Sequence, residues 1–138
     1  MAIMKLVYVV GPYRAPCEWE VLQNIRRAEE VALRVWTAGA ACICPHKNTA
    51  FFGGAAEDSV WLEGDLEMVR RSDALVCVEG WNRSTGASGE VALARQMKIP
   101  VFEQFEDLVD WLARHEVKAS EPTRGGRGLR SPFEASKP

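Results

Sequence analysis

The sequence predicts an α/β fold: a single-domain, doubly wound parallel sheet of the flavodoxin or Rossmann type. Apolar, β-branched segments of strand length alternate along the chain with longer segments of helical periodicity. Of the 138 residues, 47% are hydrophobic, which is enough to build one sizeable core. The alternation predicts four to five strands with helices on both faces, and ligands at the carboxyl ends of the strands.

The first half of the chain predicts a strand, a helix and a second strand. Residues 6–10 are apolar throughout, as in a strand that is buried on both faces. Residues 18–38 carry apolar side chains at helical spacing, and Gly39 is a stop signal for this helix. Residues 40–44 form the next expected strand.

The second half continues the alternation. We expect a loop at 45–58, a helix at 59–71 with Ser59 as its cap, and a strand at 74–78. A turn at 84–90 then leads into a helix that ends near Lys98. A strand at 100–102 and a helix at 105–116 complete the fold. The inward-facing residues of that last helix are expected to be Leu108, Val109, Trp111 and Leu112.

Domain boundaries and charge exclude some classes of protein. Residues 1–117 are expected to form the domain, and residues 118–138, rich in Gly, Pro and Arg, a disordered tail. A formal net charge of −2 argues against neutralisation of a nucleic-acid backbone as the main function, although three tail arginines (Arg124, Arg127 and Arg130) could contact nucleic acid. The short apolar N-terminal stretch predicts neither a membrane span nor a signal peptide, so we expect a cytoplasmic protein with buried, reduced cysteines.

The segment 84–90, Ser-Thr-Gly-Ala-Ser-Gly-Glu, predicts an anion site next to a carboxylate. The amides at the start of a helix bind phosphate, and the helix dipole favours an ionised glutamate at position 90. Two simpler interpretations remain open: Ser84 as an ordinary helix cap, and Glu90 as a surface glutamate. A capping box does not explain Glu90, because the residue three positions earlier is Ala87.

A second carboxylate is expected to face inward. Asp65 lies four residues after Trp61 and four before Val69, on or beside an apolar stripe. Such a residue either bonds to nearby backbone groups or has a function. Two carboxylates over a strand end, one ionised and one protonated, are the minimum machinery for cleaving a glycosidic bond.

The loop after the first strand supplies further candidates. Gly11-Pro12-Tyr13-Arg14 is expected at the same edge of the sheet, where Arg14 could pair with a phosphate. Tyr8 could reach the central carboxylate with its hydroxyl, or simply pack in the core. His46 could act as a general acid, although a loop histidine is commonly a solvent-exposed polar residue.

Four features together carry a family resemblance: Val-Tyr-Val-Val-Gly-Pro at 7–12, Asp65, Ser-Asp-Ala-Leu-Val at 72–76, and the turn that ends at Glu90. Through them, residues from about 4 to about 116 resemble the nucleoside 2-deoxyribosyltransferase superfamily. Within that superfamily the chain is more similar to small phage and bacterial transferase-like proteins and to deoxynucleoside 5′-monophosphate N-hydrolases.

The resemblance implies roles for individual residues. Glu90 would be the nucleophile that forms a glycosyl-enzyme intermediate, Tyr8 would orient it, and Asp65 would act on the base or on proton transfer to it. At position 84, transferases of unphosphorylated nucleosides tend to carry an aspartate, whereas the monophosphate hydrolases carry a serine. A hydroxyl bonds a phosphate that a carboxylate would repel, so Ser84 favours a nucleotide substrate.

We therefore expect an N-glycosidase that acts on (deoxy)nucleoside 5′-monophosphates, among them nucleotides with a modified pyrimidine, by a retaining mechanism and without cofactor or metal. Alternatives are a base-exchanging deoxyribosyltransferase, a non-catalytic nucleotide-binding or sensing module, and a nucleic-acid adaptor acting through the tail. The resemblance also implies a homodimer or higher homo-oligomer, with the loop 48–52 reaching a neighbour.

The expected phosphate-binding residues are Gly11, Tyr13, Arg14, Ser84, Thr85, Gly86, Ser88 and Gly89. Aromatic residues that could stack on the base are Phe51, Phe52, Trp61 and Trp81, of which Trp61 has core packing as its simpler role.

Overall fold

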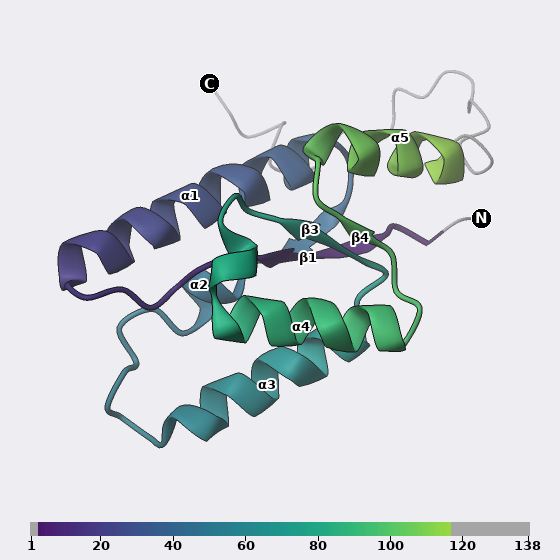
Figure 1. Cartoon of the computed structure of the whole chain (residues 1–138). Helices are drawn as coiled ribbons and strands as arrows, with labels where there is room; N and C mark the ends of the chain where they lie inside the picture. Colours follow the sequence, from purple (N-terminus) through teal and green to yellow (C-terminus); the bar gives the residue numbers. More distant parts are fainter. Residues whose placement is uncertain (1–2, 117–138) are drawn as a thin grey trace, which may run out of the picture.

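Four short parallel strands form the centre of the molecule, in the order β2-β1-β3-β4 (Figure 1). The computed structural model describes residues 3–116. Its strands are β1 (Leu6–Val10), β2 (Ala41–Ile43), β3 (Ala74–Cys77) and β4 (Val101–Phe102). This arrangement confirms the predicted α/β fold with a four-stranded parallel sheet. The predicted tail at 118–138 lies outside the described residues.

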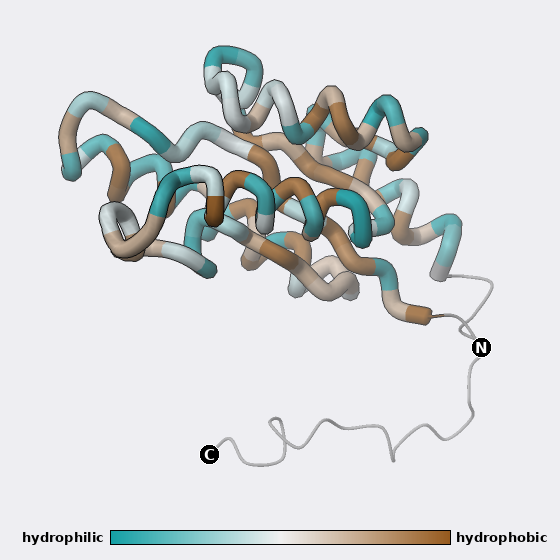
Figure 2. Tube along the Cα trace, turned by 90° about the horizontal axis from the view of Figure 1, so that it is seen from below, coloured by the Kyte–Doolittle hydropathy of each residue, from teal (hydrophilic) through white to brown (hydrophobic). Residues whose placement is uncertain are grey.

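Helices cover both faces of the sheet (Figure 1). On one face, α1 (Glu18–Thr37) and α5 (Phe105–Glu116) share a hydrophobic cluster with the strands. On the other face, α3 (Asp58–Arg70) and α4 (Thr85–Gln96) share a second cluster. Figure 2 shows the central strands as the most hydrophobic segments of the trace. None of the helices within residues 3–116 is long and apolar enough to cross a membrane.

The direction of winding reverses between β1 and β3. After β1 the chain moves to one side of the sheet for β2 and then returns to the other side for β3. In doubly wound sheets, ligands bind at the carboxyl ends of the strands where the winding direction reverses. The candidate residues should therefore be sought at the ends of β1 and β3.

Alternation along β1 points its side chains to the two faces in turn. Val7 and Val9 belong to the cluster under α1 and α5, whereas Tyr8 and Val10 belong to the one under α3 and α4. All four are fully buried, as the apolar sequence predicts. Tyr8 is the polar exception, so its hydroxyl needs a partner on the face of α3 and α4.

Several predicted boundaries need correction. The segment expected as a loop contains a one-turn helix, α2 (Pro45–Asn48), because a proline fits the first helical position. Helix α3 begins one residue early, with Glu57 at the N-cap position, so Ser59 lies inside the helix and does not cap it. Val109 is 40% exposed because it lies beside the stripe formed by Leu108 and Leu112, not on it.

The cysteines are free, as expected, but not all of them are buried. Cys44 and Cys77 are buried and Cys42 is half-buried. Cys17 is exposed because it occupies the N-cap position of α1, at the surface end of that helix.

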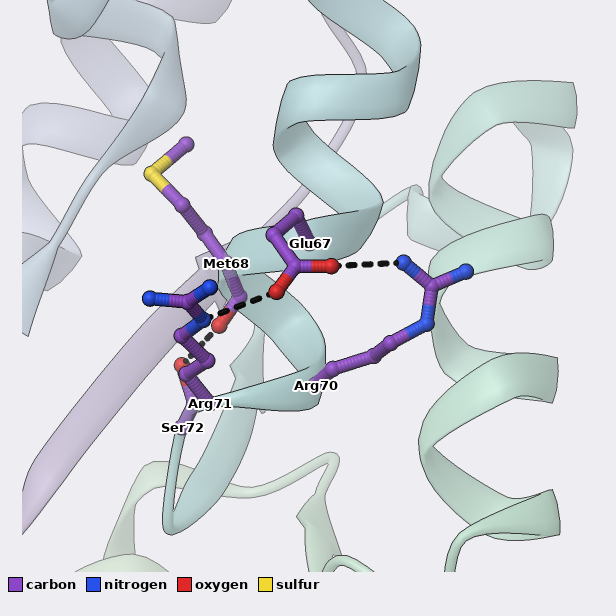
Figure 3. Close-up of polar contacts among 5 residues, drawn as sticks. All are labelled: Glu67, Met68, Arg70, Arg71 and Ser72. Carbon is purple, nitrogen blue, oxygen red and sulfur yellow. Dashed lines mark hydrogen bonds and ion pairs between the residues drawn. The ribbon is translucent and has the colours of Figure 1, made fainter.

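The end of α3 is held by short-range polar contacts (Figure 3). The Ser72 hydroxyl donates to the carbonyl of Met68 at 2.8 Å, and Glu67 pairs with Arg70 and Arg71. Exposed ion pairs of this kind contribute less than about 1 kcal/mol each. The orientation of α3 is therefore set mainly by its buried side, which in turn fixes the position of Asp65 one turn earlier.

Candidate functional site

A hydrogen bond joins β1 to α4 at the centre of the candidate site. The Tyr8 hydroxyl donates to Oε2 of Glu90 at 2.8 Å. Tyr8 is fully buried on β1, and Glu90 is half-buried on the inner side of α4. Burial, followed by the charges of Glu90 and Asp65, raises the pKa of Tyr8 far above its ordinary value. Tyr8 therefore stays protonated and acts as a fixed donor to the carboxylate.

Asp65 joins this pair from α3. Its side chain is half-buried, and burial raises the pKa of Asp65 to about 6. Its charge raises the pKa of Tyr8 and of Glu90, so the three groups lie within electrostatic reach of one another. No hydrogen bond to its carboxyl group is found within residues 3–116, which leaves the purely structural role of a backbone-bonded aspartate unsupported there.

Glu90 titrates differently from the sequence-based expectation. Burial raises the pKa of Glu90 to about 7; the hydrogen bond from Tyr8 opposes this rise and the Asp65 charge adds to it. We expected the helix dipole to keep Glu90 ionised, and this expectation is wrong. Glu90 lies six residues after the cap, in the second turn of α4, where the dipole is weaker than the loss of water.

The start of α4 is also different from the predicted turn. The 3₁₀-helix η1 (Trp81–Arg83) precedes it, and α4 begins at Thr85. Ser84 is the N-cap: its hydroxyl accepts from the amide of Ala87 at 3.2 Å, and its carbonyl accepts from the amide of Ser88 at 2.9 Å. The predicted phosphate cradle over 84–89 is thus too long, because the helix uses its amides from Ser88 onward. The amides of Thr85 and Gly86 have no acceptor within the helix.

Two glycines of α4 border open space. A Cβ atom placed on Gly86 or Gly89 would meet nothing within 4 Å. Each glycine destabilises the helix by about 1 kcal/mol relative to alanine, so packing within the chain does not explain them. Gly64 of α3 has the same open surroundings, so open space alone does not indicate a ligand at Gly86 and Gly89.

Gly11 has a packing role. A Cβ atom at this position would lie 2.7 Å from Cβ of Val78, closer than real Cβ contacts. Gly11 thus allows the loops that follow β1 and β3 to touch. Whether it also contacts phosphate stays a prediction.

The rest of the first loop is tied to neighbouring helices. The Tyr13 carbonyl accepts from Nδ2 of Asn24 on α1 at 3.1 Å. Arg14 is exposed and pairs with Asp58, at the start of α3, at 2.9 Å. This pair is weak because both side chains face water, so a stronger anion can replace Asp58.

His46 is buried, contrary to the expectation for a loop histidine, because it lies on α2 and packs beneath the first loop. Its Nε2 atom lies 2.8 Å from the carbonyl oxygen of Pro12. Burial lowers the pKa of His46, so its ring is neutral near pH 7. We did not single out Asn24 from the sequence. The only signal there was a polar residue at a half-inward position of a helix.

The predicted base-stacking residues have three different surroundings. Phe52 and Trp61 pack against each other with ring centroids 5.5 Å apart, while Trp81 packs against the cluster under α3 and α4. Phe51 is 89% exposed with a left-handed φ of 66°. The Nε1 atom of Trp61 is buried without a hydrogen-bond partner, on the same side of α3 as Asp65.

Within residues 3–116, no group of three or more His, Cys, Asp or Glu side chains is arranged to hold a metal ion. A buried carboxylate with a fixed donor, next to a second carboxyl group of raised pKa, is suited to nucleophilic and acid–base work.

Comparison with solved structures finds a protein of similar fold. The chain is similar to a 2-deoxyribosyltransferase from the psychrotolerant bacterium Bacillus psychrosaccharolyticus, described as a biocatalyst for the synthesis of antiviral and antitumoral nucleosides. The TM-score is 0.52 at 23% identity, with 70% of this chain and 69% of the other covered. At this identity the likeness shows a shared fold.

Comparison by sequence gives the family. No curated protein matches the chain. One family profile matches residues 5–104, a span that includes Tyr8, Asp65 and Glu90. The chain therefore belongs to the family described as "Domain of unknown function (DUF7768)".

Proposed function

We propose that this protein is an N-glycosidase that cleaves the base from (deoxy)nucleoside 5′-monophosphates through a covalent intermediate on Glu90. The observation that carries the proposal is the 2.8 Å hydrogen bond from Tyr8 to Glu90, with Asp65 within electrostatic reach. A buried carboxylate aimed by a fixed donor is the arrangement that nucleophilic attack on a sugar requires.

The proposed reaction has two displacements at the anomeric carbon. In the first, a carboxylate oxygen of Glu90 forms a bond to this carbon as its bond to the base nitrogen breaks, and the departing base takes a proton from Asp65. In the second, water attacks the glycosyl ester, releases (deoxy)ribose 5-phosphate and restores the Glu90 carboxylate. The proton from that water returns to Asp65.

Both carboxyl groups have a raised pKa, and Glu90, the proposed nucleophile, has the higher value, so the first step requires the proton of Glu90 to leave when the substrate binds. With a pKa of about 6, Asp65 holds a proton in a useful fraction of molecules near neutrality. Glu90, with a pKa of about 7, must lose its proton before attack. The positive charge that develops on the sugar in the transition state stabilises its carboxylate at the moment of reaction.

A phosphate fits the N-terminal end of α4. The amides of Thr85 and Gly86 lack intrahelical acceptors, and the Ser84 hydroxyl is a neutral group that can bond an anion. Arg14 adds a positive charge that only an exposed aspartate pairs with. An aspartate at position 84 would repel the phosphate, so Ser84 favours a nucleotide over a nucleoside.

The base would lie toward α3. Among residues 3–116 the Trp61 indole N–H has no acceptor, and a carbonyl oxygen of a nucleobase would satisfy it once the side chains that bury it move aside. Phe52 lies against the same indole ring and would cover the base or the ester from water. The resemblance further suggests a homo-oligomer, for which the exposed Phe51 is a candidate contact.

Base exchange is a second candidate function, and the 2-deoxyribosyltransferase fold neighbour favours it. The first displacement would be the same, but a second base would attack the Glu90 ester in place of water. Transfer requires the acceptor base to outcompete water, and nothing at the N-terminal end of α4 decides between them.

A substrate panel tests the proposal. The protein is incubated with (deoxy)nucleoside monophosphates, including modified pyrimidines, and with the matching nucleosides, and free base is measured by chromatography with and without a second base. We expect release from monophosphates, loss of release in Glu90→Gln, and unchanged release in Glu63→Gln, a matched change of an exposed glutamate on α3. Tight nucleotide binding without release would instead indicate a sensing module, and equal release by Glu90→Gln would reject the mechanism.

A further inference from the structure

Two side chains from different elements hold consecutive carbonyl groups of the loop after β1. His46 of α2 contacts the Pro12 carbonyl through Nε2 at 2.8 Å, and Asn24 of α1 donates to the Tyr13 carbonyl at 3.1 Å. The two holding residues lie 22 positions apart in the sequence, on opposite sides of β2 along the chain. The loop is thereby fixed from outside, without strand or helix hydrogen bonds of its own.

The contact with Pro12 defines the state of His46. A carbonyl oxygen only accepts, so Nε2 must carry the hydrogen in the neutral ring. The Nδ1 atom then carries the lone pair, and it is buried without a hydrogen-bond partner in the described part of the chain. His46 is 5% exposed, and its ring packs edge-on against Tyr13 with centroids 5.7 Å apart. This environment leaves the ring one tautomer and very little freedom.

Because the peptide bond is planar, the direction of each held carbonyl also sets the direction of the next N–H group. In a trans peptide, the carbonyl of one residue and the N–H of the next point in opposite directions. Since the carbonyls of Pro12 and Tyr13 point to His46 and Asn24, the N–H groups of Tyr13 and Arg14 point away from those two side chains. Both are absent as donors from the backbone hydrogen bonds of residues 3–116.

Gly11 and Arg14 make further contacts between this loop and its neighbours. Gly11 lies against Val78, so the start of the loop cannot move toward β3, and Arg14 reaches the beginning of α3 through Asp58. The loop after β1 thus offers two backbone N–H groups and one guanidinium, the last of them near the start of α3. Each of these groups is a donor from which an anion can accept a hydrogen bond.

We infer that His46 and Asn24 are positioning residues, which hold this loop so that the Tyr13 and Arg14 amides and the Arg14 side chain receive the phosphate of the substrate. The inference rests on the proposed function for the identity of the ligand. Neither residue touches the reacting atoms, so both act on substrate binding and not on the chemical step.

Substitutions at position 46 separate a positioning role from mere packing. Glutamine can place an amide N–H near the position of Nε2, asparagine reaches only the position of Nδ1, and phenylalanine keeps the ring volume without a donor. We expect KM for the monophosphate to rise about tenfold in His46→Phe and His46→Asn, with kcat within about twofold of wild type, because one hydrogen bond is lost. His46→Gln should restore KM to within about threefold, and Asn24→Asp should behave like His46→Phe.

The matching nucleoside, which has no phosphate, is the internal control. Its KM should be the same in all four variants as in the wild type. An equal rise of KM for nucleotide and nucleoside, or a loss confined to kcat, would overturn the inference. So would failure of His46→Gln to recover while its thermal unfolding matches that of the wild type.

A second readout needs no substrate. We expect the amides of Tyr13 and Arg14 to have NMR order parameters near about 0.85 in the wild type, below about 0.6 in His46→Phe, and restored in His46→Gln. If the wild type cleaves nothing, the proposed function fails while this measurement still decides on the holding of the loop. Unchanged order parameters in His46→Phe would reject the inference even if the enzyme were active.

Discussion

Tyr8 and Glu90 are 82 residues apart in the sequence, and the Tyr8 hydroxyl donates to Oε2 of Glu90 at 2.8 Å. Tyr8 comes from the first strand and Glu90 from the helix after the third strand, and both lie on the face of the sheet covered by α3 and α4. The bond therefore forms only when α4 packs against β1. The pKa of Glu90 therefore depends on the folded structure.

Tyr8→Phe and Asp65→Asn should move the titration of Glu90 in opposite directions. The Tyr8 hydrogen bond lowers the pKa of Glu90, so its removal should raise the pKa above about 7; the Asp65 charge raises the pKa, so its removal should lower it. Carbon-13 NMR of the Glu90 carboxyl group measures both shifts directly. Shifts in the same direction would contradict the arrangement of the three groups.

Glu90→Gln should stabilise the protein in a pH-dependent way. The pKa of Glu90 in the folded protein, about 7, is above the ordinary value of 4.5, so its stability contribution is full below pH 4.5 and is lost as the pH rises through 7. Glutamine cannot ionise, and its carbonyl still accepts from Tyr8. The free energy of unfolding of Glu90→Gln should exceed that of the wild type at pH 8, by roughly 3 kcal/mol at most.

Urea unfolding at pH 4 and pH 8 checks this difference. The two proteins should be equally stable at pH 4, where Glu90 is protonated. The exposed Glu63→Gln should give no such pH-dependent gain. A constant difference at both pH values would mean that the substitution acts through packing and not through charge.

Gly86→Ala and Gly89→Ala should separate stability from function. Because a Cβ atom at either position meets nothing, alanine should stabilise α4 by about 1 kcal/mol in thermal unfolding. If a ligand approaches this backbone, the same substitutions should weaken nucleotide binding. Gly64→Ala is the matched control on α3: a Cβ there also meets nothing, so it should stabilise the protein and leave binding unchanged.

Ser84→Asp should change substrate preference without loss of the cap. Aspartate caps helices as well as serine does, and its charge suits the N-terminus of α4, so unfolding should be unchanged within about 0.5 kcal/mol. Steady-state kinetics should show a higher KM for the monophosphate and an unchanged or lower KM for the nucleoside. Ser84→Ala, which loses the bond to the Ala87 amide, should lower stability by about 1 kcal/mol. A monophosphate KM that Ser84→Asp leaves unaltered would show that phosphate binds elsewhere.

The fold was predictable because its signals are local. The apolar run at 6–10 and the helical spacing at 105–116 gave both elements with the bounds that the structure has. The start of α4 was predicted less well, since Gly86 and Gly89 are typical of turns, although the interpretation of Ser84 as a helix cap is confirmed. Local composition indicated a turn where tertiary structure completes a helix.

The sequence predicted which residues form the candidate site, but it did not predict the pKa of Glu90. The spacing of Asp65 indicated an inward carboxyl group, and the structure brings it within electrostatic reach of Tyr8 and Glu90. The pKa of Glu90 depends on how much water the packing of three elements removes, which no local pattern records. Asn24 was missed, and the contact of His46 with the first loop was not foreseen, because the partners of both side chains are backbone carbonyls that any sequence would supply.

Mass spectrometry of the peptide that contains Glu90 tests the central claim most directly. The protein is mixed with a cleavable (deoxy)nucleoside monophosphate, quenched in acid within milliseconds and digested. The account predicts a mass increase of one (deoxy)ribose 5-phosphate unit on Glu90, absent in Glu90→Gln. Base release that proceeds with Glu90 never modified, or modification of a different residue, would contradict it.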